Sequence, residues 1–172
     1  MAAERLSEIE AAAVEHLRAL IRFDTSNPPG NERPAAEYVA AVGRRAGLET
    51  HLLDSVPGRG NAVLRLRGRG EGPPLLMLGH LDTVPAEPDH WTHSPWAAEV
   101  ADGCVWGRGA IDSKLTVATQ LAALVDLAGS GWAPGRDVVL AATAAEEGGG
   151  AANGAAWLAE QRPDLVAASH TL

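Results

Sequence analysis

The sequence is short of cysteine, of basic residues and of long apolar runs. Cys104 is its single cysteine, which excludes an internal disulfide and suits a reducing compartment. Lys and Arg number 14 against 22 Asp and Glu, for a formal net charge of -8, whereas nucleic-acid binding needs clustered basic residues. No run approaches the roughly 18 apolar residues of a membrane helix, and residues 1–17 lack the apolar segment of a signal peptide. We therefore expect a cytoplasmic protein that binds neither nucleic acid nor membrane.

The hydrophobic content of 46% is enough for one core, and 172 residues leave room for a single globular unit. Apolar spacing predicts helices over residues 7–23, 33–46, 113–127 and 149–161, the first with a capping-box pattern of Ser7 and Glu10. Apolar or alternating runs predict strands over residues 48–56, 61–67, 74–80, 137–143 and 164–168, and a hairpin over residues 100–106. Helices that alternate with strands predict a three-layer α/β/α fold around a mostly parallel sheet.

Three short motifs place His and acidic residues at the ends of predicted strands or hairpins. These side chains are His80 and Asp82 in GHLDTVP, Asp112 in GRGAIDSK, and Glu146 and Glu147 in AAEEGGG. Ligands of open α/β sheets bind at the carboxyl ends of the strands, so the motifs are expected to meet there. An imidazole and several carboxylates are the groups that a pair of divalent metal ions needs as ligands and general base. The combination indicates a hydrolase site.

Each motif taken alone also has an ordinary structural explanation. His80 and Asp82 share a strand face, so the carboxylate can orient the imidazole, but a His can equally cap a strand against a loop. Asp112 precedes a predicted helix, where capping alone favours Asp. Glu146 and Glu147 can be a solvated pair in an exposed loop, although adjacent like charges also suit a bound cation. Only the conjunction of the three motifs favours a metal site.

In this order and spacing the motifs resemble the zinc-dependent aminoacylase and carboxypeptidase family, which includes acetylornithine deacetylase, succinyl-diaminopimelate desuccinylase, carboxypeptidase G and carboxypeptidase S. The likeness extends from FDTSNPPGNE over nearly the whole remaining chain. It implies that His80 binds one metal ion, that Asp112 bridges two, and that Glu147 binds the other. It also implies that Glu146 is the general base and that Asp82 orients His80. The expected reaction is amide hydrolysis in a small peptide or an N-acyl amino acid, with Zn²⁺ favoured and Co²⁺ or Mn²⁺ able to use the same ligands.

The resemblance also implies features outside these residues. The family has a further carboxylate ligand a little beyond residue 172, and its smaller lid domain and final His ligand come later still. We therefore expect residues 1–172 to be a truncated part of a catalytic domain, with very low activity alone and with homodimers only in the full-length protein. Within the motifs, Ala145 and Ser113 stand where the family commonly has an acidic residue and Met or Asp, which are tolerable variations.

Other functions compete with this hypothesis. A non-catalytic module that keeps the fold, binds metal weakly and acts by binding a partner stays open. Nucleotide binding by the glycine-rich turn at residues 148–154 is disfavoured, because no G-x-G-x-x-G register fits. A serine hydrolase is disfavoured because the sequence has no G-x-S-x-G motif. His170 lies near where the missing ligand would approach, but a role as a surrogate metal ligand is disfavoured.

Overall fold

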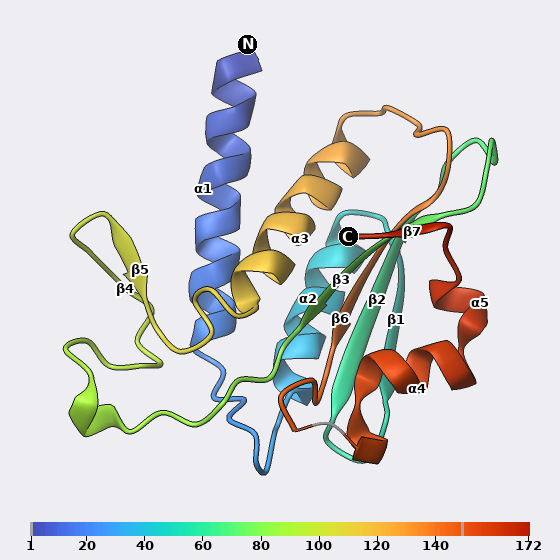
Figure 1. Cartoon of the computed structure of the whole chain (residues 1–172). Helices are drawn as coiled ribbons and strands as arrows, with labels where there is room; N and C mark the ends of the chain where they lie inside the picture. Colours follow the sequence, from blue (N-terminus) through green and yellow to red (C-terminus); the bar gives the residue numbers. More distant parts are fainter. Residues whose placement is uncertain (1, 149) are drawn as a thin grey trace.

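A computed structural model describes residues 2–148 and 150–172, which form a five-stranded sheet beside a separate two-stranded one (Figure 1). The larger sheet has the order β1-β2-β6-β3-β7. Its strands are β1 (Glu49–Asp54), β2 (Gly60–Leu66), β3 (Leu75–His80), β6 (Val138–Thr143) and β7 (His170–Thr171). β2 is antiparallel to both of its neighbours, whereas β6, β3 and β7 are parallel. β2 is therefore the one reversed strand in the described sheet, which confirms the mostly parallel arrangement.

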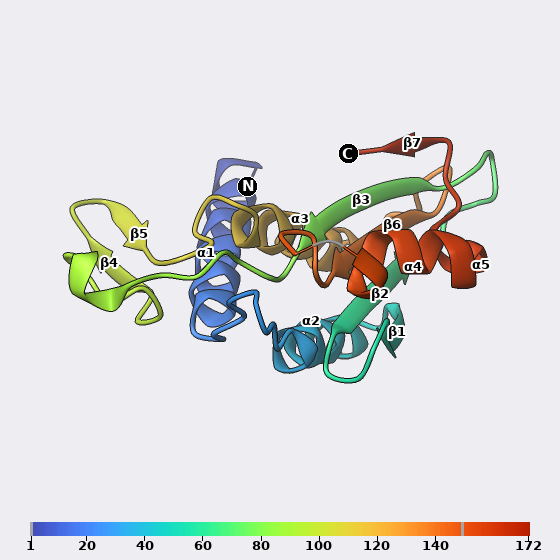
Figure 2. The same ribbon diagram turned by 60° about the horizontal axis from the view of Figure 1, so that its bottom comes forward.

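Helices cover both faces of the sheet and complete the three predicted layers (Figure 2). The first layer contains α1 (Ala2–Ile21), α2 (Arg33–Arg45) and α3 (Lys114–Gly129), and the second contains α4 (Gly154–Gln161) and α5 (Pro163–Val166). β6 serves both layers because successive side chains of a strand point to opposite faces. Leu140 and Ala142 belong to the core under the first layer, and Val139 and Ala141 to the core under the second. None of the helices in the described residues has both the length and the apolar character needed to cross a membrane.

The hairpin predicted around Asp102 and Gly103 is confirmed. β4 (Glu99–Ala101) and β5 (Cys104–Trp106) pair with each other alone, away from the main sheet (Figure 1). The two turn residues have φ values of 52° and 75°. Asp and Gly tolerate this left-handed conformation better than other residues, and it suits the twist of a two-residue hairpin turn. A 3₁₀ helix, η1 (Pro88–His90), lies in the long loop before the hairpin.

Three local predictions are wrong at particular residues. Ser7 does not cap α1, because the helix already runs from Ala2 and Ser7 lies inside it. Residues 164–168 do not form a strand: Pro163 begins the short helix α5, a position that suits the fixed φ of proline, and the strand follows at β7. The helix expected over residues 149–161 begins only at Gly154, after the 3₁₀ helix η2 (Gly150–Ala152). Gly149, its expected start, lies outside the described residues.

The late start of α4 has a local cause. Asn153 is the N-cap residue, and its side-chain oxygen accepts a hydrogen bond of 2.9 Å from the backbone N–H of Ala156. An Asn at this position satisfies a backbone donor that would otherwise lack a partner within the helix. The Glu146–Glu147 pair therefore lies after β6 and before the start of α4 rather than inside that helix.

Candidate metal centre

The predicted site residues meet at the carboxyl ends of β3 and β6. His80 is the last residue of β3 and lies opposite Thr143, the last residue of β6. Asp112 comes just before α3, and Glu147 follows β6. One possible ligand atom from each of His80, Asp112 and Glu147 lies within 4.8 Å of the other two. The structure thus brings together the three side chains that the sequence analysis assigned as metal ligands.

The two ring nitrogens of His80 face different partners. Nδ1 lies 3.0 Å from the backbone carbonyl oxygen of Asp82, and because a carbonyl only accepts, Nδ1 carries the hydrogen. Nε2 lies 3.0 Å from Oδ1 of Asp112. In the neutral ring Nε2 would present a lone pair to a carboxylate, which is unfavourable unless a proton or another cation lies between them. A metal-ligating His has this arrangement, with its second nitrogen donating to a carbonyl or carboxylate.

The protonation of His80 follows from these contacts. Burial lowers its pKa, but hydrogen bonds to Asp82 and Asp112 outweigh this and raise the pKa to about 9. Burial also raises the pKa of Asp82, but hydrogen bonds from His80, from Asn27 and from two backbone amides lower it below its ordinary value. Near neutral pH and without metal, the centre therefore holds an imidazolium between carboxylates. A metal ion has to displace that proton.

Asp82 has more contacts than the orientation of His80 requires. Its side chain is fully buried, and Oδ1 lies 3.4 Å from Nδ1 of His80, which is longer than the 3.0 Å contact made by the Asp82 backbone carbonyl. The carboxylate also accepts the backbone N–H groups of Glu146 and Glu147, both at 3.0 Å. Asn27 donates to Oδ2 at 2.8 Å. Asp82 thus links the end of β3 to the loop after β6, a role that sequence analysis missed.

The neighbouring Glu146 and Glu147 take different places. Glu147 contributes a carboxylate oxygen to the cluster with His80 and Asp112. Glu146 lies outside that cluster: its side chain is 58% exposed, and Oε2 is 3.9 Å from Nε2 of His80. Glu146 also lines a hollow of about 360 Å³ together with His80 and Asp112. The arrangement leaves one carboxylate beside the cluster and within reach of a molecule in the hollow.

Part-buried hydrogen bonds also fix the start of α3, and two of them join it directly to His80. The hydroxyl of Ser113 accepts the backbone N–H of His80 at 2.9 Å and donates to its carbonyl oxygen at 3.2 Å. The side chain of Lys114 is buried, and its Nζ donates to the carbonyl oxygen of Phe23 at 2.8 Å. Burial lowers the pKa of Lys114 to about 8, although the nearby carboxylates of Asp24, Asp82 and Glu32 raise it.

His170 does not serve as a surrogate ligand in this structure. It lies in β7 and pairs with Leu75, the first residue of β3, whereas His80 is the last residue of that strand. Leu75 and His80 are five residues apart along β3, which is roughly 16 Å at about 3.3 Å per residue. His170 is therefore at the opposite end of the sheet from the cluster, which agrees with the sequence analysis in disfavouring a ligand role.

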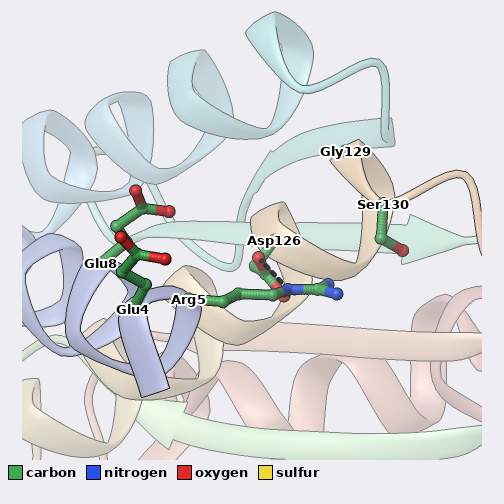
Figure 3. A pocket seen from close by; sticks show the side chains of 6 residues that line it. All are labelled: Glu4, Arg5, Glu8, Asp126, Gly129 and Ser130. Carbon is green, nitrogen blue, oxygen red and sulfur yellow. Dashed lines mark hydrogen bonds and ion pairs between the residues drawn. The ribbon is translucent and has the colours of Figure 1, made fainter. Parts of the chain in front are cut away.

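A larger hollow of about 610 Å³ lies elsewhere, between α1 and α3. Figure 3 shows its lining, in which Arg5 reaches across to Asp126 and forms an ion pair of 2.6 Å. None of the three predicted metal ligands lines it. The ion pair joins two helices at the surface, where such pairs contribute little to stability. Its chemistry does not indicate a second catalytic site.

Comparison with known sequences gives matches over much of the chain. The profile of peptidase family M20/M25/M40 matches residues 76–171. Succinyl-diaminopimelate desuccinylase of Methylorubrum extorquens is 40% identical over 109 residues, which are 62% of this chain and 28% of the relative. The chain spans between 28% and 37% of the length of such curated relatives.

Solved structures share the fold at low sequence identity. Human carnosine dipeptidase 1 superposes with a TM-score of 0.72 at 20% identity, over 87% of this chain and 36% of that protein. The YXEP protein of Bacillus subtilis, described as a dinuclear metal-binding peptidase of family M20, gives 0.63 at 17% identity, over 92% of this chain and 41% of that protein. Similarity at this level establishes the three-layer fold.

Proposed function

Because the chain belongs to peptidase family M20/M25/M40, we propose that it contributes the metal centre of an enzyme that hydrolyses amide bonds. The substrate in this proposal is a small peptide or an N-acyl amino acid. The observation that carries it is the cluster of His80, Asp112 and Glu147, whose ligand atoms lie within 4.8 Å of one another. Relatives named succinyl-diaminopimelate desuccinylase support an amide or acyl-amine substrate.

The donors of the cluster fit divalent metal ions. In the proposal His80 holds one ion, Glu147 holds a second, and Asp112 bridges them. One imidazole with carboxylates suits Zn²⁺, and Co²⁺ or Mn²⁺ can use the same donors. The dinuclear description of the Bacillus subtilis protein supports two ions. When bound, such ions supply Lewis acidity toward a carbonyl oxygen and lower the pKa of water.

The protein side chains supply the proton transfers. In the proposal Glu146 accepts a proton from the attacking water and then donates it to the leaving amine nitrogen, which is general base and general acid catalysis by one carboxyl group. Its exposed carboxylate, next to the hollow and 3.9 Å from His80, suits this task. Asp82 keeps both Glu residues in place, because its carboxylate accepts their backbone amides. Its backbone carbonyl accepts from Nδ1 of His80, which leaves Nε2 facing Asp112.

The proposal extends to the protein as a whole. Residues 1–172 are part of a catalytic domain, and full activity requires further catalytic-domain segments and a lid domain, for which the greater length of the relatives leaves room. The complete protein forms a homodimer, and these residues alone have very low activity. The proposal places the protein in the cytoplasm, because a single cysteine suits a reducing compartment.

Metal content tests the proposal first. The chain is purified without chelator and its zinc is measured by elemental analysis, beside Asp112→Ala and the control Asp89→Ala, an exposed aspartate outside the cluster. We expect zinc in the unaltered chain and the control and its loss in Asp112→Ala. Equal metal in all three proteins would contradict the ligand assignment.

Activity of an extended protein separates the proposal from its alternative. A protein that includes the further domain segments and binds metal should cleave dipeptides or N-acyl amino acids. If it binds metal and cleaves neither class, the non-catalytic binding module is the better description. If the chain binds no metal, only the scaffold of the family is retained.

A further inference from the structure

Four consecutive backbone amides after β6 donate to side chains that come from distant parts of the chain. The N–H of Ala144 donates to Oδ1 of Asn61 at 2.9 Å, and that of Ala145 to Oε1 of Glu32 at 3.3 Å. The next two amides donate to Asp82, as described above. All three acceptor residues are fully buried. Buried side chains therefore hold the segment that carries Glu146 and Glu147, because they accept hydrogen bonds from its backbone amides.

Glu32 is fully buried and forms an ion pair with the partly buried Arg59. Its two carboxylate oxygens accept from Nε and Nη2 of Arg59, both at 2.6 Å, and the side chains are 0% and 12% exposed. Arg59 also donates to the carbonyl oxygen of Pro29 at 3.1 Å. The planar guanidinium suits such two-point pairing with a carboxylate, which fixes the direction of both groups. The pairing with Arg59 thus fixes the orientation of the Glu32 carboxylate and of its remaining lone pairs.

The Glu32 side chain does not cap the helix that it precedes. Glu32 is the N-cap residue of α2, yet its side chain makes no capping hydrogen bond to that helix. The carboxylate points instead at Arg59 and at the amide of Ala145, 113 positions away in the sequence. A buried ion pair is weak evidence for a gain in stability, because desolvation can exceed the attraction. The hydrogen bond from Ala145 to Glu32 indicates instead that the ion pair positions the segment that carries Glu146 and Glu147.

Ala145 shows why this segment needs support. Its φ is 59°, in the left-handed region that a residue with a β-carbon rarely adopts. The left-handed residue lies just before the two Glu residues, so a relaxation of Ala145 would redirect both side chains. The contact from Glu32 holds the N–H of this residue, and Asp82 holds the next two.

We propose that Glu32, aligned by Arg59, is a positioning residue that holds Ala145 in its left-handed conformation and so sets Glu147 for metal binding and Glu146 for proton transfer. This inference rests on the proposed function. Glu32 touches neither metal nor substrate and acts through the backbone of the segment. Loss of an outer contact of this kind typically costs about 10-fold to 100-fold in metal affinity.

The test compares variants in which stability and positioning are separated. Glu32→Met with Arg59→Met removes both charges together, so no lone charge is left buried, and it removes the acceptor of the Ala145 amide. The control is Asp137→Asn, which breaks another buried pair, with Arg65 at 2.9 Å, before the start of β6 and thus at the opposite end of that strand. Co²⁺ affinity and the visible absorption spectrum of bound Co²⁺ are measured, with thermal unfolding of the metal-free proteins.

We expect the double variant to bind Co²⁺ about tenfold more weakly and with a changed spectrum, at a modest cost in stability. Asp137→Asn should lose stability and keep its Co²⁺ affinity within about twofold. Glu32→Gln, which keeps an acceptor oxygen but loses the charge, should fall between the unaltered chain and the double variant. Affinity that follows thermal stability across all variants would overturn the proposal, as would unchanged affinity in the double variant.

Amide hydrogen exchange by NMR on the metal-free chain separates this inference from the proposed function. We expect exchange at Ala145 to accelerate about tenfold or more in the double variant and to stay unchanged in Asp137→Asn. If the unaltered chain binds no Co²⁺, the proposed function is contradicted, and the exchange result then decides the inference. Equal exchange at Ala145 in the unaltered chain and the double variant overturns it.

Discussion

Nε2 of His80 lies 3.0 Å from Oδ1 of Asp112, although the two residues are 32 positions apart. His80 is the last residue of β3 and Asp112 comes just before α3, so the contact joins the carboxyl end of a strand to the start of a helix. Two groups that both act as metal ligands when deprotonated can approach this closely only with a cation between them. In the proposed metal centre, protons and metal ions would therefore compete for the position between these two groups.

The first prediction concerns this competition. The pKa of His80 is raised to about 9 without metal, so a bound ion displaces one proton at any lower pH. Co²⁺ affinity should then rise about tenfold per pH unit from neutral pH up to about pH 9 and level off above it. Isothermal titration at several pH values measures this slope. A flat profile over the same range would contradict the combination of a raised pKa and metal ligation at His80.

The second prediction separates the two adjacent carboxylates. Glu147→Gln should weaken Co²⁺ binding at least about tenfold, because a ligand in the cluster is lost, whereas Glu146→Gln should change it less than about twofold. In an extended, active protein Glu146→Gln should lower kcat by about 100-fold or more, the usual size of general acid–base catalysis. Each variant is the control for the other. Equal loss of affinity in both would refute the division of roles.

The third prediction is a pH dependence of stability in the metal-free chain. The folded-state pKa of His80, about 9, is above its ordinary value of 6.5. The folded protein therefore binds more protons between these values, and the free energy of unfolding should fall as pH rises through that window. Lys114 acts in the opposite direction, because its pKa is lowered from 10.5 to about 8, so stability regains part of the loss above about pH 8.

Urea unfolding at a series of pH values measures the effect, and His80→Ala is the matched variant. Up to about pH 7, where Lys114 stays largely protonated in both states, the decline should be present in the unaltered chain and absent in His80→Ala. A decline of equal size in both proteins would assign it to another group.

The fourth prediction tests the core of the central strand. Leu140 in β6 is fully buried between the sheet and the first helical layer. Leu140→Ala should lower the free energy of unfolding by about 2–5 kcal/mol, since it removes buried methyl groups and leaves a cavity. Leu6→Ala, at a side chain that is 57% exposed in α1, should cost less than about 0.5 kcal/mol. Denaturant unfolding measures both, and similar losses would contradict the assigned core.

Short-range patterns predicted most of the elements. The apolar spacing before residue 127 predicted α3, and Asp102 with Gly103 predicted the hairpin turn, because both signals depend on neighbouring residues. The errors arose where two local signals compete. Ser7 with Glu10 fits a capping box, but α1 continues through it to Ala2 because nothing in its first residues breaks a helix. Residues 164–168 look apolar enough for a strand, but Pro163 starts a helix there.

The sequence by itself predicted which side chains come together at the proposed metal centre, and the structure brings three of them close to one another. His80, Asp112 and Glu147 lie in motifs whose residue types and order indicate metal ligands, and the alternation of elements places strand ends together. Only the tertiary structure decided how they are held. The Glu32 carboxylate and the Ala145 amide are 113 positions apart, and Asn61 and Ala144 are 83 apart. Bonds from a side chain to a distant backbone amide leave no pattern in a sequence, because every residue except proline offers the same N–H, and only the folded sheet selects which ones meet.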